Sequence, residues 1–275
     1  MPVPDRPPFP DYFSAEAPRY ARHRPRYPAA LFGFLADVVP ARDAVWDCAT
    51  GNGQAAIGLA EYFAHVTATD ASTSQLTHAV PHPRISYMEA PAEASGLPGA
   101  SFDLVTVATA AHWLDLERFY AEARRVLKPN GVIAVWSYFA SHVSPEVDSV
   151  VQRYADEVLA GYWTPHHGHV HDEYRNLPFP FEEIAAPAFT VEVVWTAEEA
   201  LAYLRTWSPA QRYLAERGED PAEVVRTQLV AAWGEAVERP VRWPLFMRVG
   251  WVHDGEELTP PTAHPPDTPP ASPPG

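Results

Sequence analysis

Short apolar runs alternate with amphipathic stretches through the first half of the chain. Five runs have the length and composition of buried strands, at residues 44–49, 66–70, 85–88, 103–108 and 132–136. Residues 54–63 and 116–127 carry apolar side chains at helical spacing, and another helix is predicted between Ser72 and Pro81. Strands that are apolar on both faces and alternate with helices indicate a parallel sheet covered on both sides. The pattern therefore predicts a doubly wound, Rossmann-like α/β core over residues 40–138.

The second half of the chain follows a different pattern. Residues 139–187 are rich in aromatic side chains, prolines and histidines, which is typical of an insertion. Beyond them the pattern predicts a strand at 189–195, helices at about 197–206, 209–217 and 221–236, and a last strand at 241–252. We expect one domain over residues 11–255, preceded by an irregular segment at 1–10. Residues 256–275 alternate proline pairs with small or polar residues and are expected to form a disordered tail.

Composition and charge exclude several classes of function. The chain has 275 residues and a formal net charge of −15, which argues against nucleic acid as its main partner. Its one cysteine, Cys48, excludes an intrachain disulfide and a cysteine-based zinc site. The start of the chain lacks the apolar core of a signal peptide, and no apolar run is long enough to span a membrane. We expect a cytoplasmic protein that acts on a small molecule, without a membrane partner.

The turn after the first predicted strand carries the strongest chemical signal. Asp47 ends that strand, and Gly51 and Gly53 precede a helix that begins near Gln54. Glycines there allow the backbone to approach a ligand closely. A dinucleotide site would place a pyrophosphate at this helix start, and Asp47 would repel it. S-adenosylmethionine (SAM) carries a sulfonium and an ammonium instead, and an acidic side chain suits that cation.

Asp70 ends the second predicted strand. An acid at this position can accept both ribose hydroxyls of an adenosine cofactor, whether the cofactor is NAD or SAM. The alternative is that Asp70 only caps the helix that follows Ser72. Asp47 has a comparable structural alternative, as a strand-end acid that caps the following turn.

Together these segments resemble the class I SAM-dependent methyltransferase family, with the nearest likeness to the branch related to trans-aconitate methyltransferases. The likeness covers roughly residues 12–250. The residues that carry it are Tyr20–Pro28, Asp47–Gln54, Asp70–Ser72, Ala90–Glu93, Ala111–Trp113 and Arg125–Gly131. The resemblance implies a seven-stranded sheet, SAM as cofactor, and an N-terminal helical segment that covers the active site as a lid.

The resemblance also implies roles for individual residues. The cofactor-binding residues it indicates are Asp47, Ala49, Gly51, Gly53, Gln54, Asp70, Ala71, Ala92, Glu93 and Ala108. Among these, Ala92 and Glu93 match the pair that contacts adenine, and Ala108 ends the fourth strand beside the cofactor. Ala49 departs from the family, which has glycine there, and its methyl group crowds the ligand.

The acceptor side of the site is less defined by sequence. His112 is a candidate general base, or a packing residue together with Trp113. Arg24 lies in a cluster of arginines and could clamp a carboxylate, whereas Tyr20, Trp113, Tyr138 and Trp163 are candidates for the remaining substrate contacts. An ionised carboxylate would need no base, but a phenol or an amine would need one such as His112.

Two further possibilities stay open. Alternation along a strand would bring His167, His169 and His171 to one side as metal ligands, although nothing else in the chain requires a metal, and we expect none. The chain could also be an NAD(P)-dependent oxidoreductase, or a SAM-binding protein that has lost catalysis. The first would require a third glycine that the turn lacks.

Overall fold

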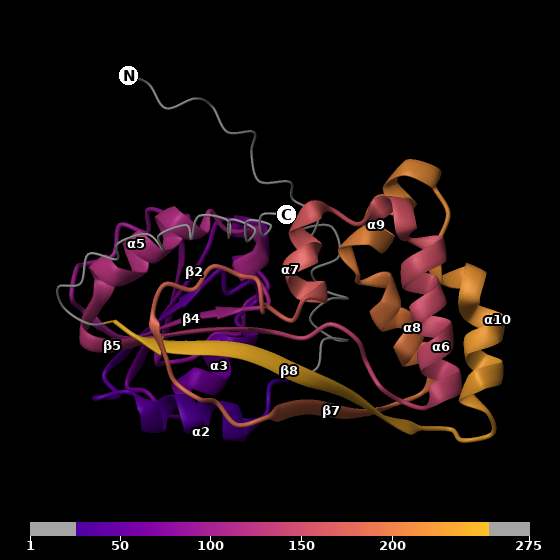
Figure 1. The fold of residues 1–275 in the computed structure, drawn as a ribbon, viewed down its shortest axis with the longest axis horizontal. Helices are drawn as coiled ribbons and strands as arrows, with labels where there is room; N and C mark the ends of the chain where they lie inside the picture. The colour runs from indigo at the N-terminus through magenta and orange to yellow at the C-terminus, as the bar shows by residue number, and fades with distance from the viewer. Residues whose placement is uncertain (1–25, 253–275) are drawn as a thin grey trace, which may run out of the picture.

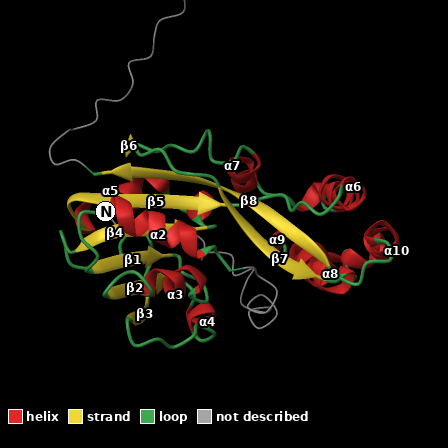
Figure 2. Cartoon of the chain, turned by 90° about the horizontal axis from the view of Figure 1, so that it is seen from below, coloured by secondary structure: helices red, strands yellow, loops and turns green. Residues whose placement is uncertain are grey.

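The computed structural model describes residues 26–252. Five parallel strands form its centre, in the spatial order β3-β2-β1-β4-β5. They are β1 (Ala44–Cys48), β2 (His65–Asp70), β3 (Ile85–Glu89), β4 (Phe102–Ala108) and β5 (Leu127–Ser137). The predicted parallel core is therefore confirmed, and all five strands end at the same edge of the sheet (Figure 2).

The last strand of the described chain, β8 (Arg239–Trp251), completes the sheet. Its C-terminal half pairs antiparallel with β5 and, over two residues, with β6 (Glu182–Glu183). Its N-terminal half runs beyond the sheet and pairs with β7 (Phe189–Trp195). The main sheet thus has the order β3-β2-β1-β4-β5-β8-β6, the seven strands that the resemblance implies. Figure 1 shows β8 running from the sheet to the helices of the second half.

Helices cover both faces of the sheet because alternate strand residues point in opposite directions. Val45, Leu104 and Trp136 are buried against α2 (Ala29–Val38) and α3 (Gln54–Ala60) on one face. Trp46, Val105 and Val135 are buried on the other face against α5 (Leu116–Val126). A short helix, α4 (Thr73–Leu76), begins at Ser72, whose side chain accepts the backbone N–H of Gln75 as the sequence predicts.

The segment Lys128–Gly131 stands between the predicted helix at 116–127 and the predicted strand at 132–136. It lies inside β5, where Leu127 pairs with Phe102 and Val132 with Leu104. Four residues on β5 therefore face a single residue on β4, which is a bulge. Asn130, at φ +59, supplies the left-handed turn within it. Pro129 and Gly131 are residue types typical of a turn, and the structure places this turn within a strand.

The second half of the chain forms a separate helical layer beside the sheet. It contains α6 (Pro145–Arg153), α7 (Gly168–His171), α8 (Ala197–Arg205), α9 (Ser208–Arg217) and α10 (Ala222–Trp233). Helix α10 packs against α6 and α8, and their apolar faces form a core that includes the buried Trp233 and Trp243. A capping box between Thr196 and Glu199 begins α8, and Gly218, at φ +71, ends α9.

The histidine run is helical, so the strand alternation that a metal site at His167, His169 and His171 would require does not occur. Pro165–His167 form a 3-10 turn and Gly168–His171 form α7. Thr164 and Pro165 account for the difference, since they form the cap and first position of a helical turn.

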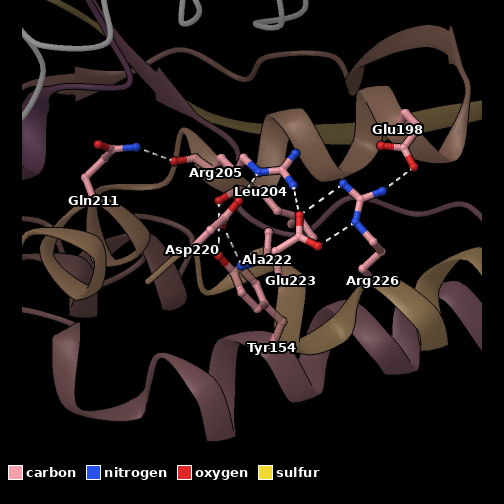
Figure 3. Close-up of polar contacts among 9 residues, drawn as sticks. All are labelled: Tyr154, Glu198, Leu204, Arg205, Gln211, Asp220, Ala222, Glu223 and Arg226. Carbon is pink, nitrogen blue, oxygen red and sulfur yellow. Dashed lines mark hydrogen bonds and ion pairs between the residues drawn. The ribbon is translucent and has the colours of Figure 1, made fainter. Parts of the chain in front are cut away.

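A network of charged side chains holds the helices of this layer together (Figure 3). Arg205, at the end of α8, donates to Asp220 at 2.5 Å and to Glu223 of α10 at 2.6 Å. Arg226 bonds the same Glu223 at 2.7 Å and pairs with Glu198 of α8. The side chain of Gln211 in α9 donates to the backbone carbonyl of Arg205 at 2.6 Å. This network, called the Arg205 network below, therefore ties α8, α9 and α10 to one another.

No helix in the described range 26–252 combines the length and apolar character needed to cross a bilayer. The irregular start at 1–10, Tyr20, Arg24 and the proline-rich tail at 256–275 lie outside the described residues. The described residues begin at 26, so of the N-terminal part of the chain the structure shows only the last residues of the segment Tyr20–Pro28 and the helix α2 that follows it.

Candidate functional site

The turn that follows β1 has the unusual backbone on which the sequence argument depends. Ala49, Gly51 and Gly53 all have positive φ, at +52°, +58° and +85°. Glycine adopts such values readily, whereas alanine does so with strain. This is the physical reason for glycine at position 49 in the related family. A side chain at Gly53 would collide with Tyr87 of β3.

Asp47 is fully buried at the end of β1, directly before this turn. Its carboxylate accepts hydrogen bonds from the hydroxyls of Thr106, at 2.7 Å, and Thr50, at 2.5 Å. Burial raises the pKa of this carboxyl to about 6, with the hydroxyls acting in the opposite direction. No lysine or arginine within residues 26–252 pairs with it. A buried acid without a cation fits a site that receives a positively charged ligand.

Asp70 lies at the neighbouring strand end and contacts the same turn. One carboxylate oxygen accepts the backbone N–H of Gly51 at 2.8 Å, and the other accepts the backbone N–H of Ser72 at 2.9 Å. Asp70 therefore fixes the turn through both of its carboxylate oxygens. The helix-capping role belongs to the side chain of Ser72. Ala71, beside Asp70, is exposed at this edge.

The other predicted cofactor residues lie along the same edge of the sheet. Gln54 begins α3 directly after Gly53, and Ala108 ends β4. Ala92 is buried against the α5 face of the core. Glu93 accepts the backbone N–H of Asp115, the residue that caps α5, at 3.0 Å. The predicted cofactor residues thus gather where β1, β2 and β4 end.

A pocket of about 600 Å³, partly open to solvent, lies next to this edge. Its floor comes from residues after β4 and β5, including Thr109, His112, Trp113 and Tyr138. Its remaining wall comes from the helical layer, with Trp163 and His167 beside α7 and Trp207 and Ser208 at the start of α9. Three of the sequence-predicted substrate residues, Trp113, Tyr138 and Trp163, therefore line one pocket together with His112.

His112 is buried in the 3-10 turn Ala111–Trp113 that follows β4. Its Nδ1 lies 2.9 Å from the hydroxyl of the fully buried Tyr174, and either group can donate. Burial, together with the nearby His167, His166 and His169, lowers the pKa of His112 to about 3. The imidazole is therefore neutral at physiological pH, and its Nε2 has no hydrogen-bond partner among the described residues.

His167 is also neutral, because burial lowers its pKa to about 4. The backbone N–H of Thr164 donates to Nδ1 of His167 at 3.2 Å, which leaves the ring proton on Nε2. Nε2 lies 3.1 Å from the hydroxyl oxygen of Ser208 and donates to it. Both nitrogens of His167 are thus used to hold the polar wall of the pocket.

Several pocket residues were not identified from the sequence. Trp207 and Ser208 stand at a helix start that the periodicity predicts, but nothing in the spacing relates them to the strand ends. Tyr27 belongs to the N-terminal segment that carries the resemblance, and its hydroxyl lies 2.9 Å from that of Thr109, which lines the pocket. Thr109 has φ +56, an unusual value for threonine that places it at the mouth of the site.

The histidines do not form a metal centre in the described structure. No group of three histidine, cysteine or acidic side chains within residues 26–252 has the arrangement of a metal site. Nδ1 of His166 donates to the backbone carbonyl of His112 at 3.1 Å, and His171 packs on Phe139 with ring centroids 4.2 Å apart.

Comparison with known proteins agrees with this geometry. The family model described as the methyltransferase domain matches residues 46–135, from β1 through β5. A solved structure of a candidate type II methyltransferase from Anaeromyxobacter dehalogenans is 45% identical, covers 84% of this chain and 98% of its own, and superposes with a TM-score of 0.78. A candidate methyltransferase from Dictyostelium discoideum is 28% identical over 254 residues, covering 90% of this chain and 97% of its own. The chain therefore belongs to the class I SAM-dependent methyltransferases.

Proposed function

We propose that this methyltransferase transfers the methyl group of SAM to a small molecule held in the pocket between the ends of β4 and β5 and the helical layer. The observation that carries the proposal is the adjacency of two sites of different chemistry. The turn at 47–53 offers a buried carboxylate and left-handed backbone, and the pocket next to it is lined by aromatic rings.

We propose that Asp47 and the turn at Gly51 and Gly53 hold the methionine part of SAM, Asp70 its ribose, and Ala92 and Glu93 its adenine. When bound, SAM supplies an electrophilic methyl group on a sulfonium. The burial of Asp47 supports its role, because a carboxylate in a low-dielectric site attracts a cation strongly. Ala108 and Thr109, at the end of β4, would separate the cofactor from the acceptor.

The chain's contribution to catalysis would be alignment and the exclusion of water. Methyl transfer is an in-line displacement, so its rate depends on holding the acceptor atom opposite the departing sulfur. The aromatic wall formed by Trp113, Trp163 and Trp207 supports this role, since it would remove water from a bound acceptor.

A carboxylate is one candidate acceptor, with Arg24 as its clamp. Supporting it, Arg24 stands three residues before Tyr27, which contacts Thr109 at the pocket. Opposing it, the lining formed by residues within 26–252 contains no lysine or arginine. Arg24 lies outside the described residues, as do Arg19 and Arg22 of the same cluster, so a cation for a carboxylate acceptor would have to come from that segment.

Calorimetric titration tests the cofactor part of the proposal. We expect S-adenosylhomocysteine (SAH), the product of the reaction, and SAM to bind with a stoichiometry of one, and NADH not to bind. Binding of NADH in place of SAM would instead support an oxidoreductase. SAM binding without transfer of a labelled methyl group to any acceptor would indicate a binding protein that has lost catalysis.

A further inference from the structure

The lining of the pocket has a consistent chemistry. Six aromatic side chains surround it, namely Trp113, Tyr138, Phe139, Trp163, Tyr203 and Trp207. The polar groups between them are hydroxyls and imidazoles. Within the described part of the chain, no aspartate, glutamate, lysine or arginine lines the space.

The aromatic rings that line the pocket also contact one another, several of them at steep angles. Trp163 meets His167 edge to face, with centroids 5.0 Å apart at 82°, and lies 5.9 Å from Trp207. Trp113 meets the same histidine at 5.1 Å and 86°. Aromatic rings in such crossed arrangements favour a planar guest that can make both stacked and edge contacts.

The part of the pocket lining that lies within residues 26–252 offers no ion-pair partner to a charged guest of either sign. A carboxylate would find no cation in the described lining, and burial of an unpaired charge costs several kcal/mol. A protonated amine would find no acid there. The pKa values of His112 and His167 are lowered to about 3 and about 4, mainly by burial, so positive charge is already disfavoured at these positions.

We infer that the acceptor is an uncharged planar aromatic molecule with a hydroxyl group, and that this hydroxyl donates a hydrogen bond to Nε2 of His112. This inference rests on the proposed function. The hydroxyl oxygen forms the new bond to the methyl carbon as the bond between sulfur and methyl breaks. The hydroxyl proton, which the hydrogen bond to the neutral His112 directs away from the methyl group, is released to solvent, which leaves a neutral methyl ether and SAH.

The hydrogen bond to Tyr174 suits His112 for this step. When Nδ1 donates to the Tyr174 oxygen, 2.9 Å away, Nε2 carries the lone pair that accepts the hydrogen bond from the acceptor hydroxyl. Tyr174 is fully buried between α7 and the sheet, so it acts as a positioning residue that fixes the ring.

Ser208 supplies a second polar contact of defined direction. Because His167 donates to its oxygen, the Ser208 hydroxyl is left to donate its own hydrogen to a group in the pocket. An acceptor with a second oxygen, opposite the methylated hydroxyl, would match this donor. Ser208 is thus a specificity residue of the same site.

Three naphthalene compounds of similar shape and different charge test the inference. The SAH-saturated protein is titrated at pH 7.5 with 2-naphthol, 2-naphthoic acid and 2-naphthylmethylamine, which are neutral, anionic and cationic at that pH. We expect 2-naphthol to bind at least about tenfold more tightly than either charged analogue, a difference of about 1.4 kcal/mol. We also expect labelled SAM to methylate 2-naphthol in wild type but not in His112→Asn.

Matched variants separate the pocket from the fold. Trp163→Leu keeps an apolar side chain but removes a ring face, and should weaken 2-naphthol binding about fivefold to tenfold. Trp251→Leu makes the same change beside the start of β5, at the opposite end of the sheet, and should leave binding unchanged. SAH binding should persist in both variants, which shows that each is folded.

The outcomes are distinct. Preferred binding or methylation of 2-naphthoic acid or the amine overturns the inference and leaves the methyltransferase proposal intact. Failure of the SAH-saturated protein to bind any of the three also overturns it. Methylation of 2-naphthol at an unchanged rate in His112→Asn removes the role of His112. If SAH itself does not bind, the proposed function fails first.

Discussion

Nδ1 of His112 and the hydroxyl oxygen of Tyr174 lie 2.9 Å apart, which links the turn after β4 to the segment that follows α7. The two residues are 62 positions apart in sequence, and both are buried. The contact fixes the imidazole ring at the floor of the acceptor pocket. The position of the His112 ring at the end of β4 therefore depends on how the segment after α7 packs.

Removal of this contact should lower catalysis more than binding. In Tyr174→Phe the buried Nδ1 loses its partner, so we expect kcat for 2-naphthol to fall about tenfold or more. The KM for 2-naphthol and the Kd for SAH should change less than about twofold. Steady-state kinetics and calorimetry measure these values.

Tyr120→Phe is the control, because it removes a comparable hydroxyl, bonded to the carbonyl of Pro178 at 2.8 Å, away from the pocket. Equal losses of kcat in both variants would contradict the positioning role.

The pKa of His112 predicts how stability depends on pH. Its folded-state pKa, about 3, lies below the ordinary value of 6.5, so between these limits the unfolded chain binds a proton that the folded chain does not. His112 therefore stabilises the fold fully above pH 6.5, and this contribution is lost as pH falls toward 3. At pH 5 the loss is about 2 kcal/mol.

Chemical denaturation at pH 7.5 and pH 5 checks this value. His112→Asn cannot titrate, so its stability should change with pH by about 2 kcal/mol less than that of wild type. His167 contributes in the same direction and Asp47 in the opposite one, and both remain in the variant. Identical pH dependence in wild type and His112→Asn would contradict the buried, neutral state of the ring.

Asp47 predicts a pH dependence for cofactor binding. Burial raises its pKa to about 6, and a cationic ligand favours the ionised form. SAM affinity should therefore decrease as pH falls from 7.5 to 5. Asp47→Asn should bind SAM about 10- to 100-fold more weakly, and with little dependence on pH in this range. Calorimetry across the pH range tests this, and an unchanged affinity in Asp47→Asn would exclude the carboxylate from the cofactor site.

Ala49 offers a test of backbone strain in the turn. Replacement of an alanine at φ +52 by glycine relieves strain of about 1 kcal/mol, so Ala49→Gly should be at least as stable as wild type. Ala100, at φ +49, lies far along the chain from the cofactor turn and provides the matched control. Ala100→Gly should have a similar effect on stability, whereas only Ala49→Gly should alter SAM affinity. A clear loss of stability in Ala49→Gly would contradict the strained backbone.

The Arg205 network predicts a link between the helical layer and the acceptor pocket. Arg205 is about one-quarter exposed and bonds Asp220 and Glu223, so Arg205→Met should lower the free energy of unfolding by about 1 to 2 kcal/mol. Because α8 and α9 carry Tyr203 and Trp207 to the pocket, binding of 2-naphthol should weaken while SAH binding persists. Arg175→Met is the control, since Arg175 pairs with Glu173 on the exposed surface. An unchanged affinity for 2-naphthol in Arg205→Met would show that the network does not shape the pocket.

The cofactor side of the site could be predicted because its signals are local. The apolar run before Asp47, the glycines after it, and the acid at Asp70 each describe a strand end or turn within a few residues. Parallel strands in a doubly wound sheet then bring those ends to one edge. The alternation of strands and helices was sufficient for this inference.

The acceptor side could not be predicted in the same way. Trp163 lies in the loop before the turn Pro165–His167, and Trp207 lies between α8 and α9, so their meeting at 5.9 Å depends on how the helical layer packs, which spacing does not encode. The histidine run is too short for its period to separate strand from helix, so its helical state followed only from Thr164 and Pro165. The segment Lys128–Gly131 likewise had turn composition but lies in a bulge within β5.

The crystal structure of this protein with SAH bound would test the central claim most directly. The account predicts the amino acid part of SAH over the turn at Gly51 and Gly53, its ribose at Asp70, and its sulfur directed toward the pocket that His112 and Trp163 line. A sulfur directed away from that pocket, or SAH bound at another edge of the sheet, would contradict it.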